Sequence, residues 1–279
     1  MPTFPAPQPV PVRVDVPFAN VHVVAGERDD VVVTVLPTNA KSGSTRAAEQ
    51  VRVDRDGDAV SITYPGSWKQ YVLPFAAGTA DITVELPEGS SVSGKAGSLY
   101  AEGTLSAVDM ALSAGNARVD DVERLDLKVS AGSATAGRVT GSLDLKVSAG
   151  SVFVDEVSGD GAIRATNGTT TVGSVTGALE VHGAHGDIAV SRVRGTVTAK
   201  SAHASIRVNN LESGAVTLTT SFGSIEVGVP EGTAAYLDLS SESGSVRNQL
   251  TPTDGPVEDE ATAEIRASTG FGDVVVRRP

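Results

Sequence analysis

The chain repeats itself at an interval of 18 residues. Residues 125–133 and 143–151 both read LDLKVSAGS. A corner motif, in which a small residue precedes a polar one and then an apolar one, recurs along the same stretch. Self-similarity at a short, fixed period is typical of stacked structural units, so the sequence predicts a solenoid. The lead positions of the motif are Gly97, Gly115, Gly132, Gly150, Gly168, Gly186, Ala204, Gly223 and Gly244.

Apolar and polar residues alternate within each repeat. Leu125, Leu127 and Val129 would face one way, and Asp126 and Lys128 would face the other. A period of two, rather than 3.6, predicts strands and not helices. Branched aliphatic residues recur at matching places and would stack into a continuous dry core. One such column is Val122, Val139, Val157, Val175, Val193 and Leu211.

Two corners that carry glycine recur in each turn of the predicted solenoid. The first is at the lead positions, and the second is at Gly141, Gly159, Gly177 and Gly195. Glycine suits a corner because it reaches positive φ without a Cβ clash. About 18 residues per turn with short strands is typical of a parallel β-helix. We therefore predict an all-β fold, a single elongated parallel β-helix (β-solenoid).

Composition divides the chain into four predicted segments. Residues 1–11 form a proline-rich lead-in, and residues 12–90 form an irregular N-terminal β cap with the first coils. Residues 91–250 form the regular solenoid. Residues 251–279 form an acidic loop and a closing coil, which would end the stack with Arg277 and Arg278 as an edge-protecting charged terminus.

An aromatic cluster lies within the predicted cap. Tyr64, Trp68, Tyr71 and Phe75 fall in the run YPGSWKQYVLPF. Large rings that gather at one end of a solenoid would plug its open core. The alternative interpretation is an exposed patch that contacts a partner or ligand.

The formal net charge is −12 and the chain has no cysteine. This charge argues against nucleic acid or an anionic membrane as the main partner. The absence of cysteine excludes disulfides and thiolate metal sites, and no apolar run is long enough to span a membrane. We expect a cytoplasmic protein.

A basic column precedes the first corner by four residues, and an acidic column precedes it by six. On a parallel sheet these columns would be neighbouring outward stripes. We interpret them as a solubilising ladder of charge pairs; the alternative is a binding stripe for an anionic polymer or an acidic partner. The basic residues are Lys128, Lys146, Arg164, His182 and Lys200, and the acidic ones are Asp109, Asp126, Asp144 and Glu180.

Three histidines fall close together in the repeat, namely His182, His185 and His203. His185 and His203 share one corner column, with Phe222 above them, and Asp187 is the one evident additional metal ligand. Structural zinc needs four protein ligands and catalytic zinc three, so we interpret this column as a plain stacked ladder.

Enzyme motifs are absent from the sequence. There is no Walker loop, no G-x-S-x-G elbow, no H-E-x-x-H and no calcium-binding nonapeptide. The Asp column alternates with Lys, unlike the clustered acids of a polysaccharide-cleaving β-helix. We therefore expect no catalytic, metal or cofactor site.

The run VELPEGSSVSGKAGSLYAEG, the SAGS and TNGTTTV corners and the ending STGFGDVVVRR resemble the bacterial family of putative adhesins, β-strand-repeat domains of unknown function. The resemblance covers nearly the whole chain after the lead-in, and it implies a β-solenoid with no established catalytic residues. The resulting hypothesis is a non-enzymatic surface for protein or polymer binding, monomeric or in a small oligomer. The alternatives are a self-assembling scaffold resembling bactofilins and a carbohydrate-active β-helix enzyme.

Overall fold

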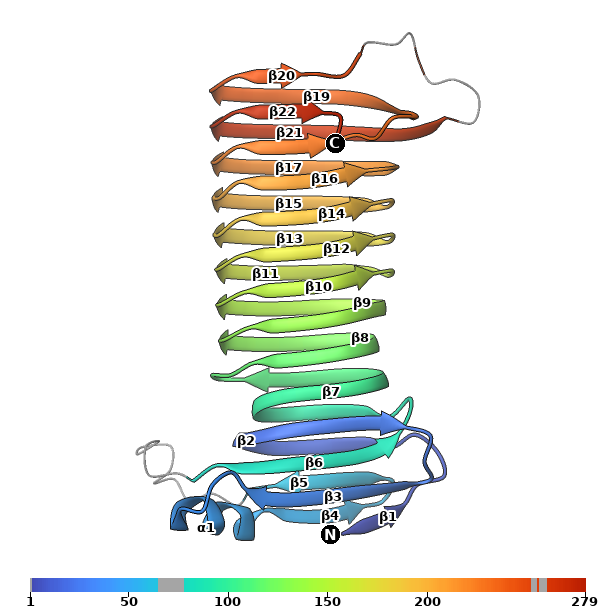
Figure 1. Ribbon diagram of the computed structural model, residues 1–279, viewed down its shortest axis with the longest axis vertical. Helices are drawn as coiled ribbons and strands as arrows, with labels where there is room; N and C mark the ends of the chain where they lie inside the picture. Colours follow the sequence, from blue (N-terminus) through green and yellow to red (C-terminus); the bar gives the residue numbers. More distant parts are fainter. Residues whose placement is uncertain (1, 65–77, 252–254, 256–259) are drawn as a thin grey trace. The chain divides into compact units, whose positions relative to one another are not determined.

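β-Strands make up nearly all of the regular structure (Figure 1). The computed structural model describes residues 2–64, 78–251, 255 and 260–279. The predicted all-β class is confirmed. The chain divides into two compact units, Met1–Ala136 and Gly137–Pro279, called unit 1 and unit 2 below. The segment boundaries predicted after residues 11, 90 and 250 stay predictions.

Unit 1 is built around the long strand β2. This strand pairs in parallel with β7 along one edge and with β5 and β6 along the other. β3 is antiparallel to β1 and β6, and β4 and β5 form an antiparallel hairpin. β8 continues in parallel from β7. The strands are β1 (Thr3–Pro5), β2 (Pro11–Gly26), β3 (Asp30–Pro37), β4 (Arg52–Asp56), β5 (Ala59–Thr63), β6 (Ala80–Pro87), β7 (Ser91–Leu112) and β8 (Ala117–Ala131).

A helix that the sequence analysis did not predict lies in unit 1. It is α1 (Ser42–Gln50), and it lies within residues 12–90, the segment predicted as an irregular β cap. The segment SGSTRAAEQ has no period-two alternation of apolar residues. Ser44 and Ala47, three positions apart and thus on one helical face, are its buried residues.

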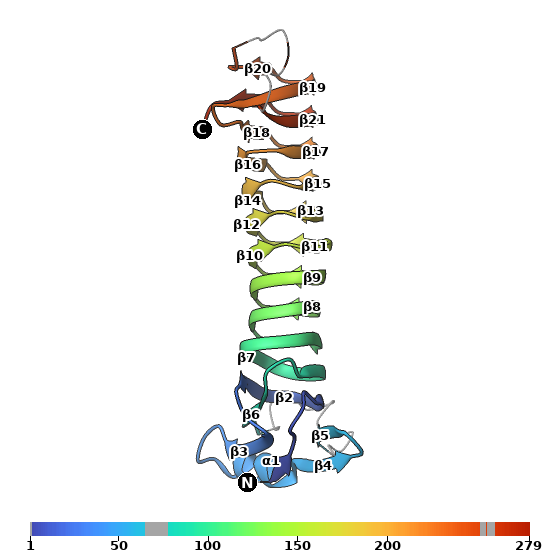
Figure 2. The same ribbon diagram turned by 90° about the vertical axis from the view of Figure 1, so that its right-hand side faces the viewer.

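Unit 2 consists of parallel strands in two facing stacks, which Figure 2 shows side by side. From β10 to β14, each strand pairs in register with the strand 18 residues further along the chain. β9 (Ala134–Ala149) leads into this unit. The other strands are β10 (Val152–Val157), β11 (Gly161–Asn167), β12 (Thr170–Val175), β13 (Ala178–His185), β14 (Ile188–Val193), β15 (Thr196–His203), β16 (Ile206–Leu211), β17 (Gly214–Phe222), β18 (Ile225–Gly228), β19 (Thr233–Ser243), β20 (Val246–Asn248), β21 (Ala261–Phe271) and β22 (Val274–Arg277).

The core of unit 2 consists of apolar columns, as predicted. Val157, Val175, Val193 and Leu211 stand in register on successive rungs, and all four are fully buried. Each branched side chain therefore packs on its counterparts in the rungs above and below it.

Both corners need glycine because successive rungs approach too closely for a Cβ, and the first corner needs it for its backbone conformation as well. At the first corner Gly168 has a φ of +133°, in the left-handed region that favours glycine. At the second corner Gly159 does not have positive φ, so the predicted explanation is wrong there. A Cβ on Gly159 would lie 1.8 Å from the carbonyl oxygen of Gly141. Close backbone approach between rungs excludes a side chain at the second corner.

The last coil of the chain does not end the stack, contrary to the prediction. β21 pairs with β17 along one edge and with β19 along the other, and β22 lies likewise between β18 and β20. Figure 1 shows β19 and β20 as the outermost strands of unit 2. Burial follows this order: Ile265 and Val274 are fully buried in the inner coil, whereas Val246 in the outer coil is 46% exposed.

Arg277 and Arg278 do not protect an edge, contrary to the prediction; they form hydrogen bonds between the inner coil and the coil before it. Arg277 Nε donates to Glu226 Oε1 at 2.6 Å, and Arg278 donates to the carbonyl oxygens of Val229 and Pro230. Glu226 Oε2 also accepts from Arg207 Nε at 2.9 Å. The hydrogen bond from Arg277, together with that from Arg207, lowers the pKa of Glu226.

Candidate functional site

The basic stripe predicted from the sequence exists as a column in unit 2. Lys146, Arg164, His182 and Lys200 stand in register on four successive rungs of one strand stack. The acidic column beside it is interrupted. On the same four rungs its positions are occupied by Asp144, Ala162, Glu180 and Thr198, so only two of the four are acids. Lys128 belongs to unit 1, where it stands beside Ala111. A binding role for the stripe stays a prediction.

Most cations of the stripe pair with an acid two residues earlier on the same strand. The distance from Lys146 Nζ to Asp144 Oδ2 is 2.8 Å. Arg164 instead contacts an acid of the neighbouring strand, with Nη1 3.3 Å from Asp144 Oδ1. Lys128 Nζ lies 3.2 Å from Asp126 Oδ1. Exposed pairs of this kind contribute about 0 to 1 kcal/mol each. The pairs therefore offset the positive charge of the stripe, and they add little to the stability of the fold.

Glu180 and His182 form a similar pair, with 2.8 Å between Oε1 and Nε2. The hydrogen bond from His182, followed by its charge, lowers the pKa of Glu180. Glu180 is therefore a carboxylate at neutral pH. Of the five basic residues, Lys200 is the one with no ion pair among the residues that the structure describes.

The histidine column is a stack of rings. His185 and His203 are partners in register, with ring centroids 5.1 Å apart and an interplanar angle of 2°. Asp187 has a structural hydrogen bond at the corner, since its Oδ1 accepts from the backbone N–H of Ser205 at 3.0 Å. Within the described part of the chain, no three His, Cys, Asp or Glu residues gather as metal ligands would.

The stack continues through two phenylalanines. His203 and Phe222 are 5.0 Å apart, and Phe222 and Phe271 are 4.9 Å apart, each with an interplanar angle of 2°. Phe222 is 46% exposed and Phe271 is 53% exposed. His185, His203, Phe222 and Phe271, called the ring ladder below, thus present a row of ring edges along one corner of unit 2.

Sequence reasoning placed three rings of the ladder and missed the fourth. Phe271 precedes the corner glycine Gly272 as Phe222 precedes Gly223, so the sequence does mark Phe271 as a residue of the same corner position. It was missed because chain order puts Ser243, not Phe271, after Phe222. The pairing of β21 with β17 brings the two phenylalanines together.

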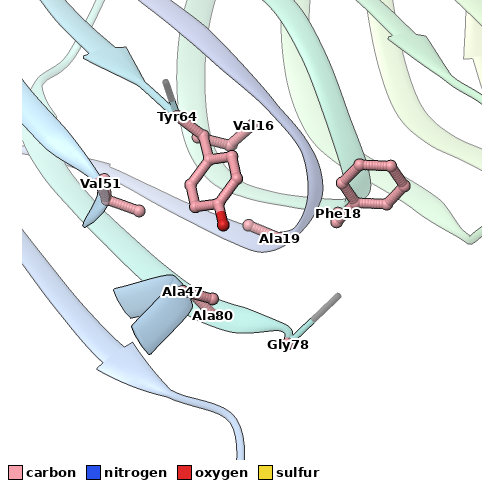
Figure 3. A pocket seen from close by; sticks show the side chains of 8 residues that line it. All are labelled: Val16, Phe18, Ala19, Ala47, Val51, Tyr64, Gly78 and Ala80. Carbon is pink, nitrogen blue, oxygen red and sulfur yellow. The ribbon is translucent and has the colours of Figure 1, made fainter. Parts of the chain in front are cut away.

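Tyr64 is the one member of the predicted aromatic cap that the structure describes. Its hydroxyl donates to Gln50 Oε1 at 3.0 Å, and its ring lines a small apolar pocket of about 20 Å³ in unit 1 (Figure 3). Trp68, Tyr71 and Phe75 lie outside the described residues, so the cap stays a prediction. The pocket is lined by Val16, Phe18, Ala19, Ala47, Val51, Tyr64, Gly78 and Ala80.

In unit 2, parallel strands stack in register over an aliphatic core, which is an arrangement typical of a β-solenoid. The model of the Toastrack DUF4097 family matches residues 12–277, and the chain belongs to that family. The resemblance seen in the sequence is thus confirmed. The comparison with curated proteins found no match.

Several solved structures are similar to this chain. A putative lipid binding protein from Parabacteroides distasonis is 13% identical, with a TM-score of 0.40 over 98% of this chain and 95% of that one. A putative adhesin from Parabacteroides merdae is 14% identical, with a TM-score of 0.36 over 99% and 94%. A putative adhesin from Bacteroides fragilis is 11% identical, with a TM-score of 0.35 over 99% and 95%. At these values the likenesses say nothing about function.

None of the helices in the described residues has the length and apolar character that crossing a membrane requires.

Proposed function

We propose that this Toastrack-family chain is a non-enzymatic binding module that contacts a protein or polymer partner through the ring ladder of unit 2. The observation that carries the proposal is the exposure of Phe222 and Phe271 in one ordered stack. Aromatic side chains, Phe among them, are enriched at the cores of protein interfaces relative to the rest of the surface. Their parallel planes and their position at the ends of paired strands fix them before a partner arrives, which lowers the entropic cost of binding.

The acids of the stripe support a binding role over a catalytic one. A glycosidase needs a general acid with a raised pKa. Glu180 has a lowered pKa because His182 donates to it, and Asp144 is shared by Lys146 and Arg164. Glu180 is therefore held ionised, which is the opposite of what protonating a leaving group requires.

Replacing Phe222 and Phe271 together by Ser should abolish capture of the native partner. The experiment is affinity capture from the native source with the purified chain as bait, followed by mass spectrometry. The matched control is Phe153→Ser, since Phe153 is 44% exposed on β10, away from the ladder. A four-residue variant of Lys128, Lys146, Arg164 and Lys200 to Ser tests the stripe in parallel. Unchanged capture by the ladder variant, or loss only in the stripe variant, contradicts the proposal.

A self-assembling scaffold is the second candidate, and the outermost coil favours it. In the described residues β19 pairs along one edge only, and Leu237, Leu239 and Val246 of this coil are not fully buried. An unpaired edge with apolar side chains can template a second copy.

We nevertheless expect a monomer or a small oligomer. The outer strand carries the exposed acids Asp238 and Glu242, and two copies that met there would bring like charges together. Light scattering and electron microscopy of the intact chain would distinguish the candidates. Filaments would favour the scaffold. The cytoplasmic location expected from the sequence remains a proposal, to be checked by cell fractionation.

A further inference from the structure

Unit 1 has an outward groove that lies outside the 18-residue repeat. It has a volume of about 280 Å³ and runs over β6, β2 and β7, which are neighbouring strands with β2 in the middle. The register places Asp81 beside Asn20, and it places Thr83, His22 and Tyr100 in one row. All of these side chains stand on rigid paired strands, which hold a binding site more accurately than loops do.

A hydrogen-bond network fixes one end of the groove. Asp81 Oδ1 accepts from Asn20 Nδ2 at 2.8 Å and from Thr38 Oγ1 at 3.0 Å. Asn20 Oδ1 in turn accepts from Ser98 Oγ at 2.7 Å. The carboxylate and the amide are therefore held in position from both sides, and each keeps a further polar atom or N–H for a ligand.

The other end of the groove combines a contact between a histidine and a carboxylate with an aromatic ring. His22 Nε2 lies 3.2 Å from Glu102 Oε1, without the geometry of a hydrogen bond. Tyr100, which stands beside His22, is 43% exposed. Neither the Tyr100 hydroxyl nor the Thr83 hydroxyl has a hydrogen-bond partner within the described residues.

We propose that this groove binds a neutral saccharide. Sugar hydroxyls both donate and accept, and the groove offers acceptors on Asp81 and Glu102 together with donors on Asn20 and Tyr100. The C–H face of a sugar ring is apolar and can pack on an exposed aromatic ring such as Tyr100. The two carboxylates repel an anionic ligand, and the polar lining disfavours a purely apolar one.

The test is a titration of the isotope-labelled full chain, followed by amide chemical shifts. The probes are neutral trisaccharides of glucose, mannose, galactose and N-acetylglucosamine, with a heparin hexasaccharide and pentalysine as charged comparisons. We expect saturable shifts on β2, β6 and β7 with at least one neutral trisaccharide. Tyr100→Ala and Asp81→Asn should each weaken that binding by roughly tenfold, the effect of losing one good contact.

Two further variants keep the result interpretable. Tyr236→Ala removes an exposed tyrosine from unit 2 and should leave the affinity unchanged. Tyr100→Phe keeps the ring and should lose less affinity than Tyr100→Ala, which separates a contact from a folding defect. The inference is overturned if no neutral trisaccharide gives saturable shifts, if the groove variants bind as the natural chain does, or if pentalysine or heparin binds more tightly. It does not depend on the ring ladder, whose variants leave the groove intact.

Discussion

Replacing Val175 by Asp should lower the free energy of unfolding by about 3 kcal/mol or more, because it leaves a carboxylate in a dry core. Val175 is fully buried, and its partners in register are Val157 and Val193. Neither neighbour can donate a hydrogen bond to the new side chain. Denaturant unfolding of the purified variant measures the loss, and Val157→Asp, one rung away, should behave in the same way.

The matched control is Lys146→Ser in the same unit. Lys146 faces outward and makes an exposed ion pair with Asp144, so its removal should cost no more than about 1 kcal/mol. Equal unfolding midpoints for the Asp variants and the Lys variant would contradict the inward and outward assignment of every column.

The repeat itself could be predicted because it depends on two short-range regularities. Period-two alternation decides which side chains point inward, and the 18-residue offset decides which ones stack. Together they place the column Val157, Val175 and Val193 and the stripe from Lys146 to Lys200 as the structure has them.

The order of the last two coils could not be predicted from the repeat. The coils of a solenoid are expected to stack in the order in which they occur in the chain. Here the coil of β21 and β22 lies between the coil of β17 and β18 and that of β19 and β20, although it comes last in the sequence. The apolar residues of the two coils have the same spacing, and only their burial in the structure distinguishes the inner coil from the outer one.

The groove of unit 1 could not be predicted for a related reason. Asn20 pairs with Asp81 and His22 with Tyr100, so the partners are 61 and 78 residues apart and follow no repeat. Long-range pairings of this kind have no local signal. The helix α1 was missed because its segment has neither strand alternation nor enough apolar residues to mark a helical face.

The most direct test of the account is a pair of engineered disulfides, since the ring ladder exists only if β21 lies between β17 and β19. The chain has no cysteine of its own. Thr219 and Ser268 are partners in register, with 3.5 Å between their hydroxyl oxygens, so a Cys at each position should form an intramolecular disulfide. Ser240 is one rung beyond Ser268.

Thr219 and Ser240 are then roughly 9 to 10 Å apart at their Cα atoms, beyond the reach of about 7 Å for a disulfide. Mass spectrometry of the oxidised monomers should find nearly complete cross-linking for Thr219→Cys with Ser268→Cys, and none for Thr219→Cys with Ser240→Cys. The reverse pattern would mean that the coils stack in chain order, and it would remove Phe271 from the ring ladder.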